Sequence, residues 1–230
     1  MKSLYLLVNL GAFVVPFIFS FHPRLAFYKQ WKATWMAILS SALVFIAWDM
    51  VYTKIGVWGF NPKYLLGIYI YNLPIEEILF FICIPFSCLF TIHCFQVLLK
   101  RDYFERFTDA ITITFLVFFI VFGIIFYDKL YTVATTIGAF GLLAFIRYQL
   151  RVTWLSHFYF SYAILLIPFF IVNGILTGTG LQEPVVWYNN SENMGYRILT
   201  IPFEDFFYGM FLILLNYLIY RSINQTKSVR

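Results

Sequence analysis

The chain has 230 residues, of which 62% are hydrophobic and only 12% are charged. Soluble globular proteins average roughly 45–50% apolar and about 25% charged residues, so the composition excludes an ordinary soluble domain and indicates an integral membrane protein. The formal net charge is +5. Basic residues gathered on one side of a membrane and attracted to anionic lipid account for this charge, so no nucleic-acid partner is expected.

Seven apolar runs are long enough to cross a bilayer, and they predict an all-α, polytopic membrane protein with about seven transmembrane helices. In chain order they lie near residues 4–21, 33–52, 73–99, 110–127, 130–146, 156–176 and 197–220. The first run lacks a small-x-small cleavage site and is followed directly by His22-Pro23-Arg24. We therefore expect a retained first span rather than a signal peptide.

Lysine and arginine residues are distributed unequally between the two sides of these spans. One side carries Arg24, Lys29, Lys32, Lys100, Arg101, Arg106, Arg147, Arg151, Arg221, Lys227 and Arg230. The other side carries Lys2, Lys54, Lys63, Lys129 and Arg197. The positive-inside rule predicts that the amino terminus lies outside the cell membrane and the carboxyl terminus in the cytoplasm.

The sequence repeats itself at a constant offset of 128 residues, as between Glu76 and Glu204. The matching pairs are Phe60-Asn61 with Tyr188-Asn189, Gly67 with Gly195, Pro74 with Pro202, Glu76 with Glu204 and Glu77 with Asp205. We expect a three-helix repeat in residues 1–99, a linker helix and loops in 100–129, a second three-helix repeat in 130–221 and a disordered basic tail in 222–230. The linker helix adds one crossing, so the two repeats are predicted to be parallel.

Each repeat places two adjacent acids at the start of an apolar run. Acids are ordinary in the first turn of a helix, where the macrodipole stabilises them, but carboxylates in hydrocarbon are costly and two copies of the pattern favour a function. Burial and a neighbouring like charge both disfavour the ionised form, so we expect at least one of these acids to be neutral near pH 7. A neutral carboxylic acid beside an ionised one can donate a proton at one point and accept one at another.

No second reagent is evident in the sequence. It contains no G-x-G-x-x-G or Walker motif and no clustered histidine and cysteine ligands, and Cys83, Cys88 and Cys94 are interpreted as buried small hydrophobes. We therefore expect no cofactor and no metal. The substrate predicted by this pattern is a hydrocarbon that needs only proton chemistry, and the 23% of aromatic residues could help to stabilise a carbocation.

The segment Trp58-Gly59-Phe60-Asn61-Pro62 and the two motifs Leu73-Pro74-Ile75-Glu76-Glu77 and Ile201-Pro202-Phe203-Glu204-Asp205 resemble the membrane-integral lycopene cyclase family. The resemblance covers nearly the whole chain. With both motifs in one polypeptide, the chain is similar to the fused form of the bacterial two-subunit lycopene β-cyclase and to the cyclase half of fungal bifunctional phytoene synthases.

This resemblance implies a bacterial inner-membrane isomerase of carotenoid biosynthesis that takes lycopene from the bilayer. An acid would protonate the terminal double bond, a second double bond would attack the cation, and a base would remove a ring proton. The products would be gamma-carotene and beta-carotene, which carry β-ionone rings. The acid/base candidates carried over by motif are Glu76, Glu77, Glu204 and Asp205, and which of them donates the proton stays open.

A second group of candidates, for substrate binding, is Asp49, Trp58, Asn61, Asn173, Trp187 and Asn189. Asp49 and Asn173 correspond at an offset of 124 near the outer ends of their spans, and an interhelical hydrogen-bond role is the alternative for them. The other four are expected to shape the loops at the mouth of the acidic motifs, with interfacial anchoring as the alternative for the tryptophans. Val186 stands where Trp58 does in the first repeat, and Trp187 follows one place later.

Two other functions stay open at this point. A carotenoid hydratase of the same superfamily would protonate the same kind of double bond but let water capture the cation. A proton-coupled membrane transporter could also use acids within membrane helices, although parallel repeats with acids on the outer side favour it less. A retinal-binding rhodopsin is excluded because residues 197–220 contain no lysine.

Overall fold

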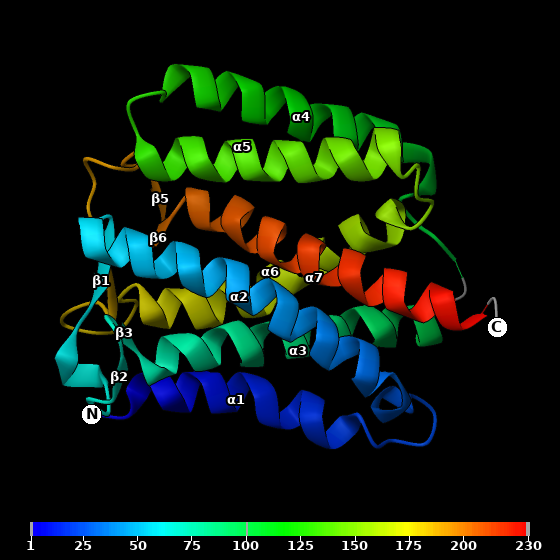
Figure 1. Ribbon diagram of the computed structural model, residues 1–230, viewed down its shortest axis with the longest axis horizontal. Helices are drawn as coiled ribbons and strands as arrows, with labels where there is room; N and C mark the ends of the chain where they lie inside the picture. The colour runs from blue at the N-terminus through cyan, green and yellow to red at the C-terminus, as the bar shows by residue number, and fades with distance from the viewer. Residues whose placement is uncertain (1, 100, 229–230) are drawn as a thin grey trace.

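A computed structural model describes residues 2–99 and 101–228 of the chain, and within them the fold is an elongated bundle of seven α-helices (Figure 1). The helices are α1 (Leu4–Phe19), α2 (Trp31–Ile55), α3 (Ile75–Leu98), α4 (Thr108–Ile125), α5 (Leu130–Ala144), α6 (Leu155–Leu176) and α7 (Glu204–Ser228). The all-α prediction is confirmed. Helices α2 to α7 lie in the six segments long and apolar enough to cross a membrane, whereas α1 is a shorter apolar helix of 16 residues.

Short strands and helical turns connect these helices. The strands are β1 (Trp58–Phe60), β2 (Tyr69–Ile70), β3 (Leu73–Pro74), β4 (Val186–Tyr188), β5 (Arg197–Ile198) and β6 (Ile201–Pro202). Three 3-10 turns, η1 (Phe27–Gln30), η2 (Pro62–Tyr64) and η3 (Glu105–Phe107), and one π-helical turn, η4 (Phe145–Gln149), complete the elements. All six strands lie at the end of the bundle where α1, α3, α5 and α7 begin (Figure 1).

The pairing of β1 with β4 joins the two predicted repeats. Its antiparallel register places Trp58 opposite Tyr188, Gly59 opposite Trp187 and Phe60 opposite Val186. Two backbone hydrogen bonds of 2.8 Å flank the pair, from Asn61 N to the Val185 carbonyl and from Asn189 N to the Val57 carbonyl. Replacing each residue by the one 128 positions away exchanges these two bonds, so the junction has the pattern of a local twofold axis.

Glycine is required at the centre of this junction. A Cβ atom on Gly59 would lie 2.3 Å from a ring atom of Trp187, which is much closer than atoms approach in folded proteins. The indole of the second repeat therefore occupies the space that a side chain on residue 59 would take. This explains why Trp187 stands one place later than Trp58 does in the first repeat.

The chain turns into α3 and α7 through matching hairpins. Strand β2 pairs with β3, and β5 pairs with β6, in registers that correspond at an offset of 128 residues. Before each hairpin a glycine adopts a positive φ, +86° at Gly67 and +75° at Gly195. Side chains other than glycine rarely adopt this conformation because their Cβ clashes with the backbone. The two turns therefore set the path by which each acidic motif enters its helix.

The predicted tail requires a correction. Residues 222–230 were expected to be disordered, but α7 continues to Ser228, and Ile223 packs against the main hydrophobic core. A helix that is anchored by packing extends readily because each added residue gains a backbone hydrogen bond. Lys100 and Arg230, used in the charge count, lie outside the described residues. The boundaries of the repeats and the sidedness of the termini stay predictions, although α1 begins and α7 ends at opposite ends of the bundle (Figure 1).

The hairpin turns generate a stability prediction. Gly67→Ala and Gly195→Ala each force a Cβ into the left-handed region and are expected to destabilise the protein by about 1–2 kcal/mol, which lowers the thermal midpoint by a few degrees. The measurement is thermal unfolding of the purified protein in detergent micelles. Gly141→Ala is the matched control, because Gly141 lies in α5 with no atom within 4 Å of an added Cβ. Equal midpoints for all three variants would contradict this account of the turns.

Candidate active site

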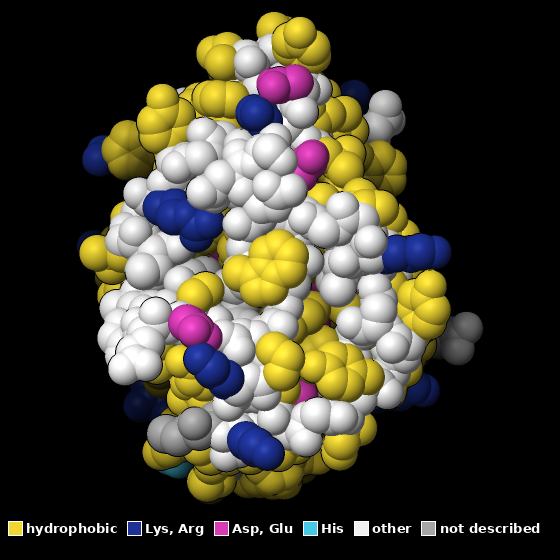
Figure 2. All heavy atoms as spheres, turned by 90° about the vertical axis from the view of Figure 1, so that its left-hand side faces the viewer, with side chains coloured by type: hydrophobic (Ala, Val, Ile, Leu, Met, Phe, Trp, Pro, Cys, Tyr) yellow, Lys and Arg dark blue, Asp and Glu magenta, His cyan; other side chains and the backbone are white. Residues whose placement is uncertain are grey.

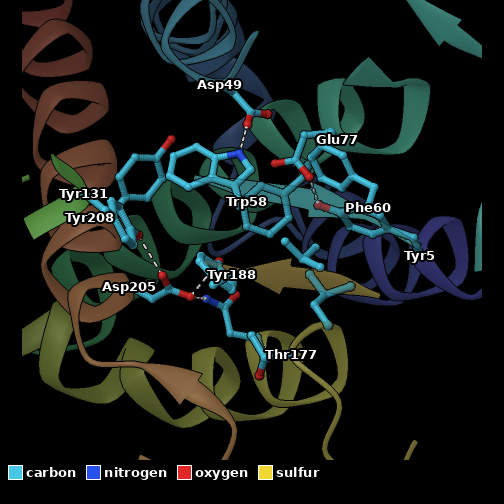
Figure 3. A pocket seen from close by; sticks show the side chains of 14 residues that line it. Tyr5, Asp49, Trp58, Phe60, Glu77, Tyr131, Thr177, Tyr188, Asp205 and Tyr208 are labelled. Atoms are coloured by element: carbon cyan, nitrogen blue, oxygen red, sulfur yellow. Dashed lines mark hydrogen bonds between the residues drawn. The ribbon is translucent and has the colours of Figure 1, made fainter. Parts of the chain in front are cut away.

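A small chamber of about 60 Å³ lies at the strand-bearing end of the bundle (Figure 3). Its polar lining consists of Asp49, Glu77, Asp205, Tyr5, Tyr131, Tyr188, Tyr208, Trp58, Asn173 and Thr177. Its apolar lining consists of Phe60, Phe80, Leu176 and Val186. The fold therefore brings three acids from α2, α3 and α7 together around one space, close to the junction of β1 with β4.

Asp205 is the acid with the most hydrogen-bond donors. Its Oδ1 accepts from the Tyr131 hydroxyl at 2.7 Å, and its Oδ2 accepts from the Tyr188 hydroxyl at 3.0 Å and from Asn173 Nδ2 at 3.4 Å. The tyrosine bonds are drawn in Figure 3. All three donors are neutral groups, and a carboxylate that accepts several hydrogen bonds is stabilised in its ionised form.

Glu77, the counterpart of Asp205 in the first half of the chain, has a different environment. Its Oε2 accepts one hydrogen bond, from the Tyr5 hydroxyl at 2.5 Å. Asp49 lies nearby on α2, and its Oδ1 accepts from the Trp58 indole and, at 3.4 Å, from the Thr53 hydroxyl. Its Oδ2 is buried and has no hydrogen-bond partner among the described residues. These two acids thus receive fewer donors than Asp205 does.

Glu76 and Glu204 do not line the chamber, although each is adjacent in sequence to an acid that does. Oε1 of Glu76 accepts from Leu66 N at 2.6 Å, and Oε1 of Glu204 accepts from Met194 N at the same distance. These backbone amides directly precede the two positive-φ glycines. Both glutamates are buried, and each therefore ties the loop before its hairpin to the first turn of its helix.

Among the tyrosines of the chamber, Tyr188 lies outside the membrane-spanning segments. Burial raises the pKa of its hydroxyl well above the ordinary value, and the adjacent Asp205 adds to this effect. The hydroxyl therefore stays protonated at neutral pH and serves as a hydrogen-bond donor. The described lining of the chamber contains no lysine or arginine, and none of the described acids, histidines and cysteines form a group of three that could hold a metal ion.

The remaining sequence candidates lie on the surface around this end of the bundle, which Figure 2 shows with charged side chains scattered among apolar ones. Asn61 donates to the Glu183 carboxylate at 2.9 Å, and Lys63 forms an ion pair with it at 2.9 Å. Lys63 lowers the pKa of Glu183 through hydrogen bonds and charge. Trp187 is 44% exposed and Asn189 accepts from Ser191, so Asn61, Trp187 and Asn189 lie outside the chamber, whereas Asp49, Trp58 and Asn173 line it.

An apolar groove of about 540 Å³ continues from the chamber along α3, between α1, α6 and α7. Phe80, Asn173, Asp205 and Tyr208 line both spaces. Along α3 the lining extends from Phe80 to Thr91, which corresponds to about 16 Å at 1.5 Å per residue. Its lining on α1 and α6 includes exposed positions. The acids are therefore reached from the side of the bundle through an apolar passage.

Sequence reasoning missed the tyrosines that hold the acids. Tyr5 and Tyr131 bind Glu77 and Asp205 in equivalent ways, but they are 126 residues apart and so fall off the offset of 128. Two further pairs of chamber residues do follow that offset, namely Phe60 with Tyr188 and Phe80 with Tyr208. Extending the comparison of the two halves to aromatic positions would have identified these pairs.

Comparison with known families gives a specific match. A family model described as lycopene cyclase matches residues 2–95 and residues 128–223 of the chain. The two matched segments contain all the chamber residues. No curated protein and no solved structure matches the chain.

The loop contacts of Glu76 and Glu204 generate a second prediction. Glu76→Ala and Glu204→Ala leave Leu66 N and Met194 N without their acceptors, and each is expected to cost about 1–3 kcal/mol of stability. Glu76→Gln and Glu204→Gln keep a carbonyl acceptor and are expected to cost much less. Thermal unfolding in detergent compares each pair of variants. If glutamine and alanine lower the midpoint equally, the acceptor role is wrong.

Proposed function

The chain belongs to the lycopene cyclase family, and we propose that it closes the open ends of lycopene to β-ionone rings by proton transfer. The observation that carries the proposal is that Glu77 and Asp205 line one chamber together with Asp49, at the end of an apolar groove. The chamber offers carboxyl groups and hydrocarbon surface. Both suit a substrate that is a hydrocarbon and a reaction that needs only a proton.

The reaction adds one proton and removes another. A carboxylic acid protonates the inner carbon of the terminal double bond, which leaves a tertiary cation on the outer carbon. The next double bond along the chain attacks this cation, so that a carbon–carbon bond closes the ring and the charge moves to the far carbon of that double bond. A carboxylate then takes the proton from the ring carbon that formed the new bond. No electrons are gained or lost, so the product is an isomer of the substrate.

The hydrogen bonds support different roles for the acids. Asp205 accepts from three neutral donors, which favours the ionised form and suits the base. It also lines the groove, so a chain that enters from the groove passes Asp205 before its tip reaches the rest of the chamber. Glu77, supported by the incompletely bonded Asp49, suits the acid that protonates the tip.

Aromatic side chains surround the same space and suit a carbocation. Trp58 packs against Tyr131 with ring centroids 5.1 Å apart, and Tyr131 stacks on Tyr188 at 6.1 Å. The faces of such rings carry negative charge density that attracts cations. These rings also fill the space around the acids and limit access of water, which favours loss of a proton from the cation over capture by water.

The product provides the first test of this function. Expression in a bacterial host that accumulates lycopene is expected to yield pigments of unchanged mass that carry one or two β-rings, identified by chromatography and mass spectrometry. A tertiary alcohol heavier by one water would indicate a hydratase. Unchanged lycopene alongside properly inserted protein would contradict the cyclase proposal.

Substitution of the two chamber acids provides the second test. Glu77→Gln and Asp205→Asn keep the shape of each side chain but remove its titration, and each is expected to lower the cyclisation rate by about 100-fold or more. Initial rates are measured with purified protein in detergent. Glu76→Gln, which alters the adjacent loop-binding acid, and Asn61→Ala on the surface are the matched controls and are expected to retain most activity. Near wild-type rates in both chamber variants would overturn the acid/base assignment.

A further inference from the structure

The apolar groove beside α1 is larger than packing defects in protein interiors, which rarely exceed the size of a water molecule. Its volume is about 540 Å³. The polar side chains along it are already satisfied, since Ser87 and Thr91 donate to backbone carbonyls and Tyr162 donates to the Phe206 carbonyl at 2.5 Å. Away from the chamber, the groove therefore presents hydrocarbon surface with no free donor. Its chemistry fits a long apolar chain.

The other half of the bundle offers an internal comparison. When the halves are exchanged, the groove between α1, α3, α6 and α7 corresponds to the space between α5, α7, α2 and α3. In that space Phe81 stands at the position of Gly209, and Phe45 at that of Phe169. Phe81 is 1% exposed and Phe45 is fully buried. The Phe45 ring lies 6.2 Å from that of Phe81 and 5.1 Å from that of Phe211.

The comparison shows that this arrangement of helices can be packed solid. Phe211 covers Gly138 so closely that an added Cβ would lie 2.6 Å from its ring. On the open side, an added Cβ on Gly11 would meet no atom within 4 Å, and one on Gly209 would make only ordinary contacts, with the Tyr162 hydroxyl at 3.4 Å and Phe169 at 3.6 Å. The fold does not require the groove, and two glycines keep it open.

We propose that this groove binds the unreacted stem of the linear polyene and that Gly11 and Gly209 set its width. The inference rests on the proposed function and deepens it, because it assigns where the substrate lies behind its reacting end. The groove is continuous with the chamber through Asp205 and Tyr208. Its length of about 16 Å accommodates part of the chain, and the rest extends into the surrounding lipid between α1 and α6.

The test fills the groove without altering the acids. Gly11→Phe and Gly209→Phe each place a ring in the groove, and Gly141→Phe places one on α5 at a position where an added Cβ meets no atom within 4 Å. We measure kcat and KM for lycopene and for a shortened polyene that has the same open end but half the length. Quenching of tryptophan fluorescence by the polyene gives the Kd separately, and thermal midpoints report folding.

The groove variants are expected to raise the KM for lycopene tenfold or more, with a smaller change in kcat, because they remove binding energy that is present in both the ground state and the transition state. The KM for the short polyene is expected to change much less, and Gly141→Phe is expected to match the wild type. If Gly209→Phe fails to fold, Gly11→Phe at the exposed edge gives the same comparison.

Unchanged KM and Kd for lycopene in folded Gly11→Phe would overturn the proposal and would mean that the groove holds a membrane acyl chain. Failure of the proposed function gives a different result. In that case the wild-type protein binds lycopene without converting it, and the Kd values of Gly11→Phe and Gly141→Phe still decide whether the groove is the binding site.

Discussion

A carboxyl group buried among hydrocarbon side chains needs hydrogen-bond donors, and the arrangement of this protein follows from how its acids obtain them. Successive side chains on a helix point about 100° apart, so adjacent acids in one first turn face different partners. Glu76 and Glu204 face the backbone amides of the preceding loops, whereas Glu77 and Asp205 face tyrosine hydroxyls across the chamber. One acid of each pair thus holds the loop, and the other is available for chemistry.

The two halves of the chain share a framework but differ in what fills it. The junction of β1 with β4, the hairpins and the loop-binding glutamates recur at an offset of 128 residues. The interior departs from this pattern, since phenylalanine rings close one side of the bundle and glycines open the other. Such a framework positions two acids symmetrically while giving each a different environment. An acid and a base can therefore arise from two copies of one motif.

The sequence predicted the helices, the paired acids and the family, because long apolar runs and acids within them are strong signals. It did not separate Glu76 from Glu77, since the direction of each side chain depends on a loop whose path is set by the φ angle of Gly67. Tyr5 escaped notice because a tyrosine near the start of an apolar run is ordinary at a membrane interface. The groove was not predictable, because it depends on which of two similar helix packings is filled by side chains.

The most direct test of the account is an experimental structure of the Glu77→Gln variant with lycopene bound. The account predicts that one open end of the polyene lies in the chamber, in contact with Gln at position 77 and with Asp205, while the stem follows the groove past Gly209. A polyene bound elsewhere, such as in the aromatic cavity lined by Phe104, Phe115 and Phe207, with its ends away from both acids, would contradict it.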